Sequence, residues 1–276
     1  MSAPVGLIAG NRELPLVVAR AVKAMGLPLA ICGLEGETGA GLRALADHYA
    51  EFPLGRLRPM AEFFLRLGVS SVSMAGGVSR ESVLERYDPD EDAQDLMEGL
   101  PDYQTDTILR AFGRYLENKG LPLVSVTDLA PQLLVKPGRL GSVEPGPALL
   151  EDLSLAFRVA RELGRLDVGQ TVVVSDLIAV ALEGADGTDA TIRRGAALSK
   201  RPIAVAKVMK PTQDFRLDLP VVGPPTLELL AGLNCAGLAL DARGLIMLER
   251  ERCVSIADKA GMALLAWLEP PATARG

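Results

Sequence analysis

Short apolar runs alternate with amphipathic stretches along the first half of the chain. Apolar runs bounded by glycine or proline predict buried strands at residues 5–9, 28–32, 69–74 and 121–126. Helical periodicity predicts helices at residues 14–25, 42–49, 60–67 and 107–118. Strands separated by helices are typical of βαβ units with a parallel sheet. The acidic stretch at residues 84–106 reads either as an exposed insertion or mobile lid, or as a solvated loop.

The pattern changes at residues 130–147, where proline and glycine cluster as in a linker. Beyond it we expect helices at 148–163, 190–198, 226–233 and 254–268, and strands at 170–174, 178–182 and 203–208. Two further strands, 236–240 and 245–248, would flank a hairpin-like turn at 241–244. The chain is therefore predicted to form two α/β domains with a cleft between them. They are an N-terminal Rossmann-like parallel sheet (1–133) and a smaller C-terminal α/β domain (134–276) carrying the charged motifs.

Composition narrows the classes of function. The 276 residues are 49% hydrophobic and 23% charged, with a net charge of −6 and no basic patch for a nucleic acid. Three widely spaced cysteines predict buried, reduced thiols. The single histidine, His48, lies in a predicted helix and argues against a Ser-His-Asp triad or a histidine-based zinc site. No signal peptide or membrane-spanning stretch is visible, so we expect a cytoplasmic protein, at most peripheral to a membrane.

Two glycine loops follow predicted strands of the first domain. Gly10 and Asn11 come after the first strand, and Gly76 and Gly77 come after the third one. In an open parallel sheet such loops face one crevice, which suits a nucleotide or sugar nucleotide. The first loop is not the GxGxxG fingerprint, so binding of a nicotinamide cofactor is only weakly indicated.

The segment 183–218 concentrates charge within an otherwise apolar region. Carboxylates can hold a hard divalent metal while Lys and Arg bind phosphate oxygens, so the mixture suits metal-assisted phosphoryl chemistry. A solvated loop with salt bridges is the alternative. Thr188 or Asp189 would cap the following helix, with or without a ligand contact. On an extended chain, Asp214, Arg216 and Asp218 would point to one side.

Three stretches together resemble the UDP-2,3-diacylglucosamine pyrophosphatases of lipid A biosynthesis, in the family that is not calcineurin-like. They read GLIAGNRELP from residue 6, EGADGTDATIRR from residue 183 and KPTQDFRLDLPVVGPPT from residue 210. The resemblance covers nearly the whole chain. It implies Mg²⁺-dependent hydrolysis to UMP and 2,3-diacylglucosamine 1-phosphate by a two-domain cytoplasmic enzyme. Two residues depart from the family pattern: Arg12 stands where a small residue or Gly is common, and Asp186 replaces a Glu.

The mechanism expected from this resemblance is in-line attack of water on a phosphorus, with Mg²⁺ or another divalent cation on the phosphate oxygens. Asp214 and Asp218 are the candidates for metal ligand or water orienter. Lys210, Lys207 and Arg194 would stabilise phosphate. The remaining candidate substrate-binding residues are Gly10, Asn11, Gly76, Gly77, Thr188, Asp189 and Gln213.

The apolar second domain would hold the two acyl chains of this substrate, and transient contact with a membrane surface is expected. A homo-oligomer is possible. The rival hypothesis is a non-catalytic protein that binds a sugar nucleotide or lipid in the same cleft.

Overall fold

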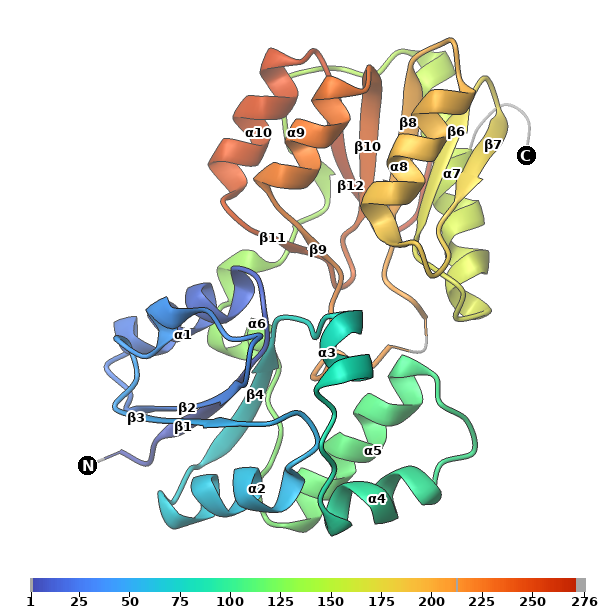
Figure 1. Cartoon of the computed structure of the whole chain (residues 1–276). Coiled ribbons are helices and arrows are strands. Elements are labelled where there is room, and N and C mark those ends of the chain that lie inside the picture. The colour runs from blue at the N-terminus through green and yellow to red at the C-terminus, as the bar shows by residue number, and fades with distance from the viewer. Residues whose placement is uncertain (1, 212, 272–276) are drawn as a thin grey trace. The chain divides into compact units, whose positions relative to one another are not determined.

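The computed structural model describes residues 2–211 and 213–271 and divides the chain into two compact units (Figure 1). The first unit comprises Met1–Pro131 together with Asp214–Asp218, and the second comprises Gln132–Gln213 and Leu219–Gly276. The sequence analysis assigned residues 214–218 to the second domain, but the structure groups them with the first. The physical reason is Leu217, whose buried side chain belongs to the hydrophobic core of the first unit. The second unit is also not the smaller one.

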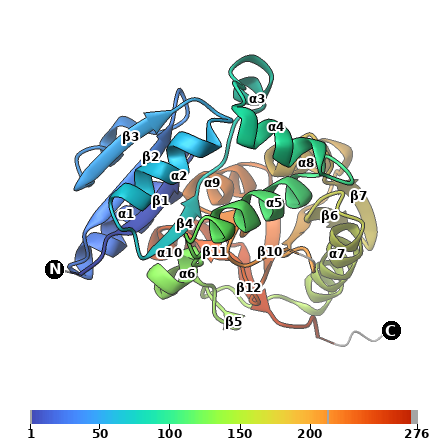
Figure 2. The same ribbon diagram turned by 90° about the horizontal axis from the view of Figure 1, so that it is seen from below.

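The first unit is built on a four-stranded parallel sheet with the order β3-β2-β1-β4 (Figure 2). Every residue of β1 and β2 is buried, which explains why these strands read as continuous apolar runs. The strands are β1 (Val5–Ala9), β2 (Leu29–Leu34), β3 (His48–Phe52) and β4 (Ser71–Ala75).

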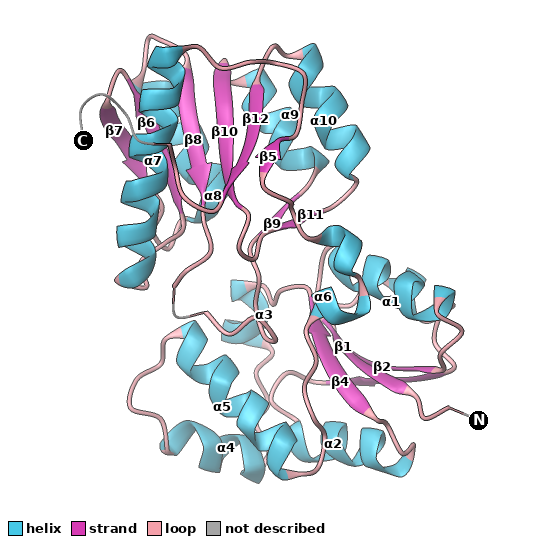
Figure 3. Ribbon diagram, turned by 180° about the vertical axis from the view of Figure 1, so that it is seen from behind, coloured by secondary structure: helices cyan, strands magenta, loops and turns pink. Residues whose placement is uncertain are grey.

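Helices cover both faces of this sheet. In Figure 3, α1 and α6 lie on one side, and α2, α4 and α5 lie on the other. On the α2–α5 side, Phe64 and Leu116 are fully buried against Ile8 and Val72. The helices are α1 (Leu14–Ala24), α2 (Leu57–Arg66), α3 (Arg80–Glu85), α4 (Glu91–Glu98), α5 (Thr105–Asn118) and α6 (Val126–Leu129), with a 3₁₀ turn η1 (Ala40–Leu42).

Two predicted elements of the first unit are wrong. Residues 42–49 are not a helix: η1 ends at Leu42, and His48 is an exposed residue at the start of β3, which pairs with β2. The Ala and Leu of this stretch favour a helix, but pairing with the buried edge of β2 overrides that propensity. The strand expected at 121–126 is reduced to a parallel bridge between Val72 and Leu123, after which α6 begins.

The second unit contains a mixed sheet with the order β5-β12-β10-β8-β6-β7. The central strands β8, β10 and β12 are parallel, whereas β6, β7 and β5 join as antiparallel partners. The strands are β5 (Gly138–Arg139), β6 (Thr171–Ser175), β7 (Ile178–Leu182), β8 (Ile203–Lys207), β10 (Cys235–Asp241) and β12 (Ala263–Trp267). A separate short pair joins β9 (Val221–Val222) to β11 (Ile246–Met247).

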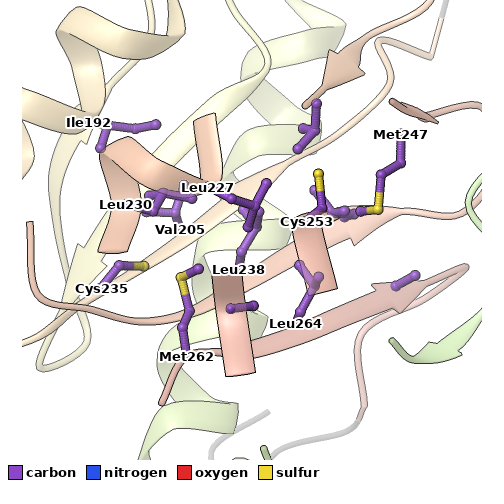
Figure 4. Packing of buried hydrophobic residues seen from close by; sticks show 14 of the residues in the cluster. Ile192, Val205, Leu227, Leu230, Cys235, Leu238, Met247, Cys253, Met262 and Leu264 are labelled. Carbon is purple, nitrogen blue, oxygen red and sulfur yellow. The ribbon is translucent and has the colours of Figure 1, made fainter. Parts of the chain in front are cut away.

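Helix α7 (Pro147–Arg165) covers one face of this sheet. The other face is covered by α8 (Gly187–Leu198), α9 (Pro224–Gly232) and α10 (Arg250–Lys259), as Figures 1 and 3 show. Figure 4 shows the core on that face, where Leu227 and Leu230 of α9 pack with Leu238 of β10. The three cysteines are all buried and free, and burial raises the pKa of the Cys235 thiol to about 12.

Two further predictions fail in the second unit, and a third holds only in part. The expected last helix (254–268) ends at Lys259, and β12 follows, because Gly261 adopts a left-handed conformation (φ 65°) that interrupts the helix. The expected hairpin around residues 241–244 does not form, since β10 and β11 belong to different sheets. The expected linker is partly structured: η2 (Pro131–Leu133) opens it and β5 pairs with β12, whereas residues 140–146 contain no helix or strand.

The acidic stretch at 84–106 contains α4, whose Asp92 is held by basic and phenolic groups. Arg58 Nε donates to Asp92 Oδ1 at 2.9 Å, and the Tyr115 hydroxyl donates to Oδ2 at 2.8 Å. Lys119 Nζ lies 3.3 Å from the same carboxylate. These contacts tie α4 to α2 and α5. The Arg58 hydrogen bond is the main reason why the pKa of Asp92 is lowered to about 2.

This lowered pKa predicts an acid-sensitive contribution to stability. The contribution is complete above the ordinary carboxyl pKa of about 4 and is lost as the pH falls towards 2. Asp92→Asn should therefore lower the urea midpoint at pH 7, and the difference from wild type should shrink by pH 3. Asp95→Asn, an exposed position on the same helix, is the control. A difference that is the same at both pH values would contradict the assignment.

Candidate functional site

The glycine loops of the first unit meet at the point where its strand order reverses. The chain runs outward from β1 to β2 and β3 and then returns to place β4 on the other side of β1. Open α/β sheets bind ligands outside the carboxyl ends of the strands at such a point. Gly10 N donates to Ala75 O at 2.8 Å, and Asn11 N donates to Gly77 O at 2.8 Å. The structure therefore brings together Gly10, Asn11, Gly76 and Gly77, as the sequence predicted.

Two of these glycines are required by the backbone itself. A Cβ atom on Gly10 would lie 2.2 Å from the carbonyl oxygen of Gly77. Gly76 has φ +85°, and a Cβ atom there would lie 2.4 Å from the carbonyl oxygen of Asn11. The close approach of the two loops thus explains both residues without any ligand. Next to them, Arg12 is a non-glycine residue at φ 66°, a backbone conformation that glycine adopts more easily.

A carboxylate that the sequence analysis missed joins these loops to α3. Glu37 accepts hydrogen bonds from the Asn11 side-chain amide and from the hydroxyls of Ser79 and Ser82, each at 2.5 Å. Burial opposes ionisation, but the hydrogen bonds from these side chains outweigh it and lower the pKa of Glu37. An acidic residue shortly after the second strand of a βαβ unit is a signal that could have found it.

Residues 214–218 form a turn and not the extended segment that the sequence suggested. Leu217 N donates to Asp214 O at 3.1 Å, and Leu217 is buried in the core of the first unit. Arg216 Nη2 donates to Asp214 Oδ2 at 2.8 Å, and this pairing lowers the pKa of Asp214. Asp218 is exposed. The expected alternation of Asp214, Arg216 and Asp218 on one face is therefore wrong, because burying Leu217 requires the chain to turn.

This turn is attached to the carboxyl-end side of the sheet in the first unit. The Ser125 hydroxyl donates to Phe215 O at 2.9 Å. Ser125 directly follows residues 121–124, which run parallel to β4. Val72 N donates to Pro122 O, and Val124 N donates to Val72 O. The structure thus places Asp214 and Asp218 at the same end of the sheet as Gly76 and Gly77.

In the second unit, Lys207 ends β8 in a nearly buried polar cluster. Lys207 Nζ donates to Thr188 Oγ1 at 3.2 Å and to Val221 O at 3.1 Å. The Thr188 hydroxyl donates in turn to Glu183 Oε1 at 3.0 Å. Lys207 and Glu183 are only 7% and 8% exposed. The two hydrogen bonds through Thr188 therefore connect an ammonium to a carboxylate away from bulk water. The sequence analysis assigned these residues to one charged segment, but it did not predict that they are hydrogen-bonded to one another.

Neither residue predicted to cap α8 does so. The helix begins at Gly187, so Thr188 and Asp189 lie within its first turn, and the Thr188 hydroxyl is engaged with Glu183. Asp189 is exposed. Arg194 donates to Asp186 at 2.8 Å and to Leu182 O at 3.0 Å, so it braces the loop before the helix.

Lys210 and Gln213 form a second polar group in this unit. Lys210 Nζ donates to Asp167 Oδ1 at 2.5 Å, and the backbone N–H of Lys210 donates to Gln213 Oε1 at 3.3 Å. Asp167 lies 43 residues earlier in the chain, and no local sequence signal pointed to it. An anionic ligand at Lys210 would share this cation with Asp167.

The fold and these clusters define a two-unit α/β protein with polar groups gathered at the carboxyl ends of its strands. Models of the LpxI N-terminal domain and the LpxI C-terminal domain match residues 4–133 and 136–265. The chain is 32% identical over 273 residues to "UDP-2,3-diacylglucosamine pyrophosphatase LpxI" of Caulobacter vibrioides (strain ATCC 19089 / CIP 103742 / CB 15). That alignment covers 94% of this chain and 96% of the relative. The chain therefore belongs to the LpxI family.

Similarity to solved structures is weak. The biotin carboxylase subunit of pyruvate carboxylase is 16% identical, with a TM-score of 0.29 over 67% of this chain and 36% of that chain. Phosphoribosylglycinamide synthetase from Anaerococcus prevotii is 10% identical, with a TM-score of 0.27 over 72% of this chain and 43% of that chain. This chain thus spans less than half of either protein, and neither similarity carries an argument about function.

The contact between the glycine loops yields a matched pair of stability tests. Gly10→Ala should destabilise the protein by about 1–3 kcal/mol, the usual cost of forcing atoms into a packed site, because its Cβ would overlap the Gly77 carbonyl. Gly41→Ala is the control, since its Cβ would have Leu16 Cδ1 as nearest neighbour at 3.9 Å. Thermal unfolding measures both variants. Equal midpoints for the two would show that the loops separate easily.

Proposed function

We propose that this protein is a metal-dependent hydrolase that cleaves the pyrophosphate of UDP-2,3-diacylglucosamine. The products would be 2,3-diacylglucosamine 1-phosphate and UMP, in lipid A biosynthesis. The observation that carries the proposal is the 32% identity, over 94% of the chain, to a UDP-2,3-diacylglucosamine pyrophosphatase. The similarity runs through both domains, so it includes every polar cluster described above.

Lys207 is a candidate for holding a phosphate oxygen. Its ammonium is nearly buried, and its position is fixed by hydrogen bonds that include those to Thr188 Oγ1 and Val221 O. A preoriented cation in a poorly hydrated position stabilises developing negative charge more than a mobile surface cation does. Lys210, which forms an ion pair with Asp167, and Arg194, which is paired with Asp186, are the other candidates.

The turn at residues 214–218 carries two carboxylates, and these support a role in metal binding and in water activation. Among the described residues, no group of three His, Cys, Asp or Glu side chains is arranged to hold a metal ion. Mg²⁺ does not require one, because it commonly binds one or two carboxylates together with substrate phosphates. Asp214 and Asp218 would supply those carboxylates, and the cation would neutralise charge on the phosphate oxygens. Asp218 is more exposed than Asp214, so Asp218 is the better residue to orient water.

We propose that the enzyme acts in the cytoplasm. We also propose transient contact with the membrane surface, because its proposed substrate carries two acyl chains. In the part of the chain that the structure describes, no helix is long and apolar enough to cross a membrane. A homo-oligomeric state stays a prediction that light scattering can check.

The direct test is hydrolysis of synthetic UDP-2,3-diacylglucosamine by the purified protein in ¹⁸O-labelled water, with Mg²⁺ or with a chelator. Release of UMP and the lipid monophosphate supports the proposal, and the label identifies the attacked phosphorus. Binding of the substrate without turnover, under both conditions, would instead support the non-catalytic alternative.

Asp218→Asn should reduce kcat at least ~10²-fold, the low end for loss of a positioned acid–base group. Because Asp218 is exposed, the thermal midpoint should stay near that of the wild type. Asp214→Asn is the informative comparison, since it weakens the pairing with Arg216 and should lower stability as well as rate. Turnover of Asp218→Asn close to wild type would remove this residue from the mechanism and leave Asp214 as the candidate.

Deacylated UDP-glucosamine should be a very poor substrate. Burial of one CH₂ group contributes about 0.8 kcal/mol, so several methylenes from two chains would contribute several kcal/mol to binding. The expected result is a kcat/KM far below that of the diacylated compound, with both measured by UMP release. Equal kcat/KM values would place specificity in the nucleotide half instead.

A further inference from the structure

The Asn11 side chain has one satisfied end and one unsatisfied end. Its amide nitrogen donates to Glu37 Oε2 at 2.5 Å. Its amide oxygen, Oδ1, is buried and has no hydrogen-bond partner among the described residues. Buried polar atoms usually have a partner, and an unmade hydrogen bond is costly. An isolated buried acceptor at the carboxyl end of β1 therefore points to a ligand that brings a donor.

Glu37 determines which atom of the Asn11 amide remains without a hydrogen-bond partner. An ionised carboxylate only accepts hydrogen bonds, so the amide nitrogen must face Glu37 and the oxygen must point elsewhere. Glu37 is itself fixed, because the hydroxyls of Ser79 and Ser82 both donate to its Oε1. Ser82 is 2% exposed, so its hydroxyl contacts Glu37 in an almost entirely buried position. The hydrogen bonds that lower the pKa of Glu37 keep the carboxylate in the ionised form that this arrangement needs.

A hydrogen-bond acceptor such as Oδ1 distinguishes the phosphates of a sugar nucleotide from its groups that carry an O–H or N–H donor. A fully ionised pyrophosphate has only acceptors and cannot satisfy Oδ1. The donors are the ribose hydroxyls, the N3–H of uracil, and the free hydroxyl and N–H groups of the glucosamine; among these, the position of Asn11 at the carboxyl end of β1 in a dinucleotide-binding arrangement favours the nucleoside. In the dinucleotide-binding fold, the acidic residue after the second strand bonds to the ribose itself. Here the corresponding carboxylate already accepts three side-chain donors, so its effect on a ligand passes through Asn11.

We propose that Glu37 is a positioning residue that fixes the Asn11 amide so that Oδ1 accepts a hydrogen bond from the nucleoside half of the substrate. The inference rests on the proposed function, because it takes the ligand to be a uridine nucleotide. It assigns the β1–β4 loops to the nucleoside and leaves the phosphates to cations. The donor is an O–H of the ribose or the N–H of the base, and the experiment below separates these sources.

The test measures binding by calorimetry of UMP and of analogues in which one donor is removed: 2′-deoxy-UMP, 3′-deoxy-UMP and N3-methyl-UMP. The wild type should bind UMP about 5–10-fold more tightly than one of these analogues, the effect of one hydrogen bond. Glu37→Gln should bind UMP and that analogue equally. Glu35→Gln, an exposed residue of the same loop, should keep the discrimination. The analogue that is discriminated identifies the donor.

Ser82→Ala separates positioning from mere stability. This variant removes one donor to Glu37 from α3 but leaves the bond between Glu37 and Asn11, so it should lower the thermal midpoint and keep the discrimination. Discrimination retained in Glu37→Gln, with only a lower midpoint, would overturn the proposal. Equal binding of all four nucleotides by the wild type, or no UMP binding, would overturn it too. The hydrolysis assay on the same preparation shows whether the proposed function fails with it.

Discussion

Burial of whole strands is the constraint on which the rest of this structure depends. Strands β1, β2, β6 and β8 are buried along their entire length, with side chains packed on both faces. Such strands have little room for unpaired polar groups, because a buried group without a partner is costly. The chemistry is therefore displaced to the strand ends. Lys207 illustrates this: it is the last residue of β8, and its buried ammonium donates hydrogen bonds to Thr188 Oγ1 and Val221 O.

The same constraint explains how much of the fold the sequence predicts. Continuous apolar runs revealed β1 and β6 because burial on both faces leaves an unambiguous pattern. The prediction failed where local preference and tertiary pairing disagree, as at His48, which starts a strand in a stretch of good helix formers. It also failed for β12, since a short apolar run reads equally well as helix or strand. The absent hairpin after Asp241 depends on sheet membership, which no local pattern contains.

The candidate site was predictable to the extent that topology fixes it. Open-sheet geometry was enough to bring Gly10 and Asn11 next to Gly76 and Gly77, because their strands are parallel neighbours. The shape of the Asp214 turn was not predictable, because it depends on Leu217 packing into a core formed by residues far away in the chain. The pairing of Lys210 with Asp167 is likewise a long-range contact. Local motifs thus identified the charged residues but not their partners.

These partners bear on how an acidic protein could bind a pyrophosphate. Several cations near the motifs are already matched by the protein's own carboxylates: Lys210 by Asp167, Arg194 by Asp186 and Arg216 by Asp214. In a protein with a net charge of −6, a bare pyrophosphate at any one of these cations would have to compete with the carboxylate that already pairs with it. A divalent cation reverses that balance, since it lets phosphate oxygens and carboxylates attract the same ion. This electrostatic requirement is the physical reason for expecting metal dependence in the proposed function.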